Sequence, residues 1–215
     1  MGDPGSALAH SINERKTESG MRILFAGMIG KLGAVAAASL FALLVSAAPA
    51  AAQNQIADPA ALDDLFVRLH NAGDEAQARS ITDEIWEMWL EPVDPVLNGL
   101  MYDVLEARQS LNLVHALGIL DRVVTEWPEY AEGWNQRATI YFMLRRYQDS
   151  LDDIIKVLEF EPRHFGALSG RSLIYRTLGD DALALQAIIE GLKYHPFLVE
   201  RQFFPQLREA PVTNI

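Results

Sequence analysis

The chain has 215 residues, no cysteine and a formal net charge of −11 at pH 7. Without cysteine it has neither a disulfide framework nor the residue that a lipoprotein anchor requires. The acidic charge disfavours nucleic acid and anionic membrane lipid as partners, because both bind to basic protein surfaces.

Residues 1–20 are polar and show no periodicity. Two interpretations are open. Either the start codon was assigned too far upstream and Met21 is the true first residue, or the segment is a disordered amino-terminal tail.

Residues 21–52 have the features of an export signal. Arg22 and Lys31 provide positive charge, a long apolar run follows, and small residues occupy positions 50–52. We therefore expect a periplasmic protein that is cleaved after a Sec-type signal peptide and begins at Gln53. A cut after Ala50 is an alternative, and so is an uncleaved anchor in the inner membrane, because the apolar run approaches the length that a bilayer requires.

The residues from Gln53 onward are expected to form one domain. They contain 14 Lys and Arg against 26 Asp and Glu, a formal charge of −12, and they suffice for one continuous core. After a linker at 53–58, the segment 59–96 predicts a degenerate helical pair, which has the architecture of the repeats that follow but departs from their pattern. Its apolar residues recur at spacings of three and four, at Leu62, Leu65, Phe66 and Leu69 and then at Ala78, Ile81, Ile85, Trp86 and Trp89.

The next three segments repeat one pattern with a period of 34 residues. They occupy 97–130, 131–164 and 165–198, and each predicts a helix, a tight turn and a second helix. Residues 199–215 predict a capping helix and a tail, because an array of helical repeats otherwise exposes an apolar face at its end.

These positions resemble the tetratricopeptide repeat (TPR) family, whose pattern alternates large, small and aromatic residues and ends on proline. The middle repeat matches it at Trp134, Ala138, Tyr141, Ser150, Ile154, Val157 and Pro162. The resemblance implies an all-α, right-handed solenoid of antiparallel helix pairs, with three clear repeats between a degenerate amino-terminal pair and a carboxy-terminal cap. The chain also resembles small exported alphaproteobacterial TPR proteins, which implies a periplasmic adaptor.

No catalytic constellation emerges from the sequence. Zinc-hydrolase, nucleophile-elbow and phosphate-loop motifs do not occur. His164 and His195 end successive repeats, where a shared metal is conceivable, but histidine at a helix carboxy-terminus also suits the helix dipole, and we favour that interpretation. We expect a protein that is not an enzyme and that uses no metal or cofactor.

The resemblance places a partner-binding groove along the first helix of each repeat. The residues expected to line it are Met101, Leu105, Arg108, Asn135, Thr139, Phe142, Met143, Ser169, Leu173 and Arg176. Their mixture of apolar, amide and cationic groups suits an unidentified protein or an extended or helical peptide. The alternative function is a structural or assembly subunit that self-associates through the ends of the repeat array.

Arg137 and Arg171 occupy a repeat position that faces the packing between helices. A buried arginine requires a partner. We expect structural ion pairs, and Asp103, one repeat before Arg137, is one candidate. Asp152, Asp153 and Glu161 are others. A polar ligand site between the repeats is the alternative.

Overall fold

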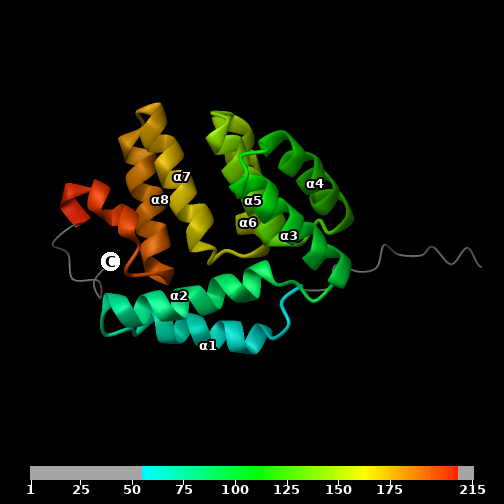
Figure 1. The fold of residues 1–215 in the computed structure, drawn as a ribbon. Coiled ribbons are helices and arrows are strands. Elements are labelled where there is room, and N and C mark those ends of the chain that lie inside the picture. The colour runs from blue at the N-terminus through cyan, green and yellow to red at the C-terminus, as the bar shows by residue number, and fades with distance from the viewer. Residues whose placement is uncertain (1–54, 208–215) are drawn as a thin grey trace, which may run out of the picture. The chain divides into compact units, whose positions relative to one another are not determined.

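The computed structural model describes residues 55–207, and this part of the chain is entirely helical (Figure 1). Within it the α-helices are α1 (Pro59–His70), α2 (Glu75–Leu90), α3 (Pro95–Gln109), α4 (Leu113–Glu126), α5 (Ala131–Met143), α6 (Tyr147–Phe160), α7 (Phe165–Leu178) and α8 (Asp181–Tyr194). Two short 3-10 helices follow, η1 (Val199–Phe203) and η2 (Pro205–Leu207). The predicted all-α fold class is confirmed.

The predictions for the start segment at 1–20, the export signal at 21–52 and the tail after residue 207 lie outside the described residues. Between residues 55 and 207, none of the helices combines the length and the apolar composition needed to cross a bilayer.

Local sequence explains where the helices begin and end. An aspartate side chain accepts a hydrogen bond from a backbone N–H in the first turn of four helices, at Asp58, Asp74, Asp94 and Asp180. Gly179 ends α7 with a φ of 82°, the left-handed conformation that glycine adopts without strain.

The three repeats form antiparallel pairs, α3 with α4, α5 with α6, and α7 with α8. Small residues allow the two helices of a pair to cross closely. In the second and third pairs a serine hydroxyl also joins the helices: Ser150 Oγ donates to the Ala138 carbonyl at 2.7 Å, and Ser172 Oγ donates to the Ala184 carbonyl at 2.8 Å. A buried hydroxyl is thus satisfied at each crossing.

The amino-terminal pair packs against the last repeat. Leu69 and Ile81 belong to the same buried core cluster as Phe165 at the start of α7 and Ile188 and Leu192 in α8. Figure 1 shows α1 and α2 running across the ends of α7 and α8. The periodicity predicted the two helices correctly, but it did not indicate that residues about 100 positions further along the chain would cover their apolar faces.

The predicted cap is present, but as two short 3-10 helices. The segment after residue 198 forms the 3-10 helices η1 and η2. Pro205 ends η1, because proline disfavours helical geometry in the residue before it. Phe204 and Leu207 are buried as a cap requires, whereas Val199 and Phe203 remain 60% and 44% exposed. The segment therefore covers the last repeat with Phe204 and Leu207.

His195 joins α2 to the end of α8. Its Nδ1 accepts a hydrogen bond from the Phe197 N–H at 3.2 Å, so the proton lies on Nε2, which donates to Thr82 Oγ1 at 3.0 Å. The Thr82 hydroxyl in turn donates to the Ala78 carbonyl. Burial lowers the pKa of His195 to about 4. Protonation would break the bond from Phe197, so the fold requires the neutral ring.

This requirement predicts a specific dependence of stability on pH. In the unfolded chain histidine titrates near pH 6.5. The contribution of His195 to the free energy of unfolding is therefore present above pH 6.5 and is lost as the pH falls to about 4, by up to ~3 kcal/mol. Urea unfolding between pH 7 and 4 should show a shallower loss in His195→Gln than in the wild type. The exposed His115→Gln variant should keep the wild-type slope, and equal slopes in all three proteins would refute the assignment.

Candidate functional site

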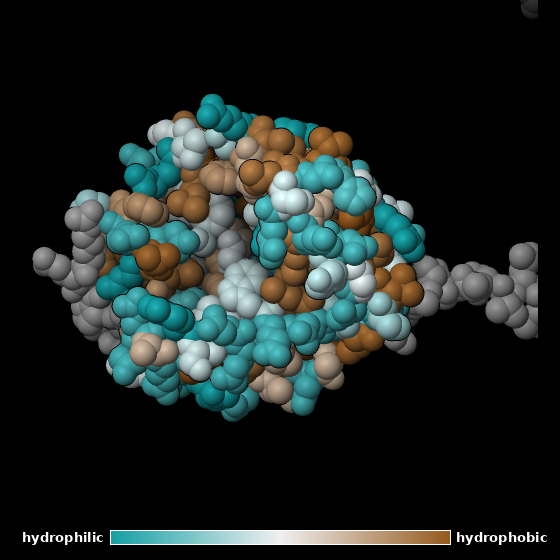
Figure 2. All heavy atoms as spheres, viewed as in Figure 1, coloured by the Kyte–Doolittle hydropathy of each residue, from teal (hydrophilic) through white to brown (hydrophobic). Residues whose placement is uncertain are grey.

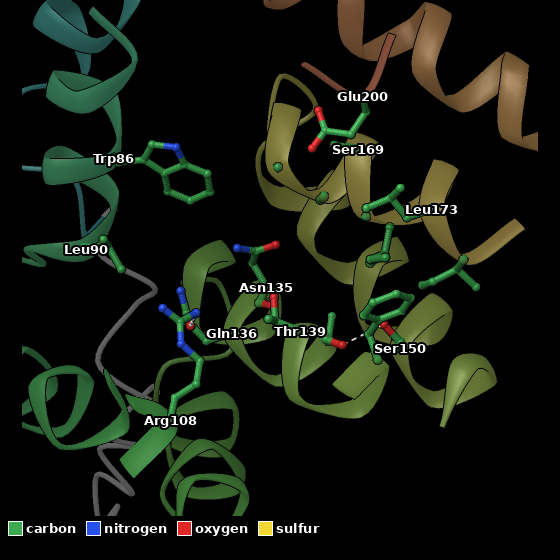
Figure 3. Close-up of a pocket in the computed structure, with 17 residues that line it drawn as sticks. Trp86, Leu90, Arg108, Asn135, Gln136, Thr139, Ser150, Ser169, Leu173 and Glu200 are labelled. Atoms are coloured by element: carbon green, nitrogen blue, oxygen red, sulfur yellow. Dashed lines mark hydrogen bonds between the residues drawn. The ribbon is translucent and has the colours of Figure 1, made fainter. Parts of the chain in front are cut away.

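A cavity of about 410 Å³ lies between α2, α5 and α7. Figure 2 shows the hollow on this face of the molecule, and Figure 3 shows the side chains around it. Trp86 and Leu90 of α2 border one side, α5 and α7 contribute Asn135 and Leu173, and Glu200 of η1 reaches the cavity from the end of the chain. The lining is mainly apolar with a few polar groups, as in ligand-binding pockets generally.

Six of the ten residues predicted for the groove line this cavity. They are Arg108, Asn135, Thr139, Phe142, Ser169 and Leu173. The repeat pattern therefore located the first helices of the second and third repeats correctly.

The other four lie elsewhere. Met101 is fully buried in a core cluster with Leu97 and Val123, so its placement in the groove is wrong. Leu105, Met143 and Arg176 are not among the residues that border the cavity. Arg176 instead lies over the ring of Phe203, 4.8 Å from its centroid.

The sequence pattern does not indicate that Trp86, Leu90, Gly166 and Glu200 belong to the site. Trp86 follows the apolar spacing of its helix, which predicts a core position, and Trp89 one turn later does lie in the core. Glu200 belongs to the segment that was expected to be only a cap. Nothing in the 34-residue period indicated that either residue would meet the first helix of a repeat.

A buried carboxylate lies next to the cavity. Glu132, which is 1% exposed, accepts hydrogen bonds from His164 Nε2 at 2.9 Å, from Asn135 Nδ2 at 3.0 Å and from the Gln136 side chain. Gln136 Oε1 accepts from Arg108 Nη1 at 2.7 Å. A hydrogen-bonded network therefore connects the core to three residues of the cavity wall, and it satisfies a charge that would otherwise be costly to bury.

His164 begins α7, whereas we expected it at the end of a helix. Its Nδ1 accepts from the Ala167 N–H at 3.1 Å, which places the proton on Nε2, the atom that donates to Glu132. The ring stacks on Trp89, with centroids 4.0 Å apart and planes within 8° of parallel. His195 does end its helix. Among residues 55–207 no group of three or more His, Asp or Glu is placed to hold a metal ion.

The comparison with known proteins identifies the family. No family model matches the chain. A TPR repeat-containing protein of Rhizobium etli is 40% identical to it over 135 residues. The match covers 63% of this chain and 66% of that protein, so just under two thirds of the relative's length is spanned. The chain belongs to the tetratricopeptide repeat family. TPR domains generally serve as non-catalytic scaffolds for interactions between proteins.

The charged residues inside this TPR array form structural contacts. Arg137 donates two hydrogen bonds to Asp153, at 2.8 and 2.7 Å, and one to Asp121 at 3.0 Å. These bonds raise the pKa of Arg137. The predicted partner Asp103 is wrong: it is exposed, and Asp153, one of the alternatives, takes its place. Arg171 pairs with Glu190 at 2.6 Å.

Gly166 allows α2 to approach the TPR repeats closely. A methyl group at this position would lie 2.6 Å from the Trp86 ring, well inside van der Waals contact. Trp86 has little room to move, because its ring packs edge-to-face against Trp89, His164 and Phe165 at centroid distances of 5.2 to 5.6 Å. The missing side chain at Gly166 therefore sets how far the tryptophan enters the cavity.

We predict that Gly166→Ala lowers the free energy of unfolding by about 1–3 kcal/mol, since overpacking a close contact costs that much. The matched control is Gly170→Ala, one turn later on the same helix and also on the cavity wall. Its added methyl would meet only the end of the Ile154 side chain, at 3.8 Å. Because alanine favours helix by up to about 1 kcal/mol, this control should be neutral or stabilising. Urea unfolding compares the two, and equal effects would contradict the proposed contact.

Proposed function

We propose that this protein is a non-catalytic TPR adaptor whose cavity between α2, α5 and α7 receives a short projecting segment of a protein partner. The observation that carries the proposal is the position of the cavity. Asn135, Thr139, Ser169 and Leu173, which lie on the first helices of two successive repeats, meet there. These helices form the surface that a TPR array generally offers to partners.

The shape of the cavity limits what can enter it. Trp86 and Leu90 of α2 border one side, so the groove does not continue as an open channel past the first helices. A volume of about 410 Å³ suits one or two side chains with their backbone rather than a long helix. We therefore propose recognition of a turn, a chain end or a protruding loop.

Site-specific photo-crosslinking in the native host tests this proposal. Phe142 borders the cavity and can be replaced by benzoyl-phenylalanine, which resembles it in shape. We expect a crosslinked protein adduct from this position. We expect no adduct from the same substitution at Ile155, which is 61% exposed on α6 and does not border the cavity. Adding Thr139→Arg, which fills the cavity, should remove the adduct from position 142.

Adducts of equal yield at positions 142 and 155 would contradict recognition in the cavity. An adduct between two copies of this chain would favour the alternative function, self-association, over an adaptor role.

We also propose that the protein acts in the periplasm, where the predicted signal at 21–52 would deliver it. The support is the sequence pattern of that segment. Cell fractionation should recover the protein with the soluble periplasmic contents, and mass spectrometry of its amino terminus should find Gln53. Recovery in the membrane fraction with residues 21–52 still attached would instead indicate an uncleaved anchor, and recovery in the cytoplasm would contradict export.

A further inference from the structure

Glu200 borders the cavity, and one oxygen of its carboxylate is buried without a hydrogen-bond partner among the described residues. The residue lies in η1, outside the repeats, and borders the cavity near Ser169 of α7 (Figure 3). Its Oε2 atom is shielded from solvent and has no hydrogen-bond partner among the described residues. Between residues 55 and 207, no other buried side-chain oxygen or nitrogen lacks a hydrogen-bond partner. Such an atom costs free energy unless a donor reaches it.

Two arginines, one on α7 and one on α3, have other contacts. Arg176, on α7, lies over the rings of Phe203 and Phe204. Arg108 borders the same cavity but stands away from Glu200, near the opposite side in Figure 3, where it donates to Gln136. The cavity therefore has a carboxylate at one side and a guanidinium at the other, and only the guanidinium is paired with a described residue.

We propose that Glu200 determines specificity by accepting an arginine side chain from the bound partner segment. This inference rests on the proposed function and names the chemistry of what the cavity takes. A guanidinium that enters the cavity would neutralise the carboxylate through a charge-assisted hydrogen bond, and a turn of the carboxylate would bring the buried oxygen to this donor. Its weak hydration makes arginine the cation that enters a partly apolar site most readily.

The remaining walls suit the rest of such a segment. Trp86, Phe142 and Leu173 provide apolar surface for the methylene groups of the arginine. Arg108, across the cavity, is a donor for backbone carbonyls. The charge of −12 on residues 53–215 attracts a basic partner to the molecule before these contacts form.

Two peptide probes of matched shape test the proposal on the mature protein at pH 7. One is acetyl-Ala-Arg-Ala-amide, and the other carries citrulline, the neutral isostere, in place of arginine. Binding is measured by nuclear magnetic resonance titration. We expect the arginine probe to bind about tenfold more tightly, as a charge-assisted hydrogen bond predicts.

Glu200→Gln should abolish this preference by weakening only the arginine probe. Glu87→Gln is the control, since it makes the same charge change on an exposed residue next to Trp86 that does not border the cavity. It should leave the preference intact. A preference that survives Glu200→Gln, or that is lost equally in both variants, would overturn the proposal.

Equal binding of both probes, or no binding of the arginine probe, would also overturn it. Neither result would affect the adaptor function, which stands or falls with the crosslink at position 142 and its loss in Thr139→Arg.

Discussion

The arrangement of this TPR domain depends on the buried hydrogen bond between Glu132 and His164. A carboxylate that is 1% exposed is tolerable only when donors surround it, and the histidine is one of three that do. The bond fixes the start of α5 relative to the start of α7. It also fixes the ring plane of His164, on which Trp89 of α2 stacks. Leaving a buried carboxylate without one of its donors typically costs about 1–3 kcal/mol or more, so this contact restricts where α2 can lie.

The position of α2 then determines the shape of the candidate site. Trp89 and Trp86 lie one turn apart on the helix. The first packs on the histidine inside the core, while the second borders the cavity. A second buried contact supports the same placement, because the Tyr130 hydroxyl donates to the Trp89 carbonyl at 2.6 Å. The groove of an ordinary repeat array thereby becomes a bounded cavity, and the hydrogen bonds from Glu132 through Gln136 to Arg108 connect this core to its wall.

The sequence was sufficient to predict the helices and their pairing, because apolar spacing, aspartate caps and the 34-residue period are local properties. It also placed Asn135, Thr139, Ser169 and Leu173 on one surface. It could not predict which distant helix would cover α1 and α2, since an apolar face does not specify its partner. The errors at Met101 and Asp103 have a related cause. Both predictions rested on repeat position alone. In the first repeat the neighbouring residues bury Met101 and leave Asp103 exposed.

Equivalent repeat positions acquire different roles because their neighbours outside the repeats differ. Met101, Asn135 and Ser169 share one position, yet the first is in the core and the other two border the cavity. The cavity is completed by Trp86 and Glu200, neither of which belongs to a repeat. The family pattern therefore specifies the scaffold and not the partner. If recognition depends on residues outside the repeats, a relative that shares only the repeat signature need not share the ligand. Comparison of binding properties within the family should begin with the residues that correspond to Trp86, Gly166 and Glu200, because these decide the depth and charge of the cavity.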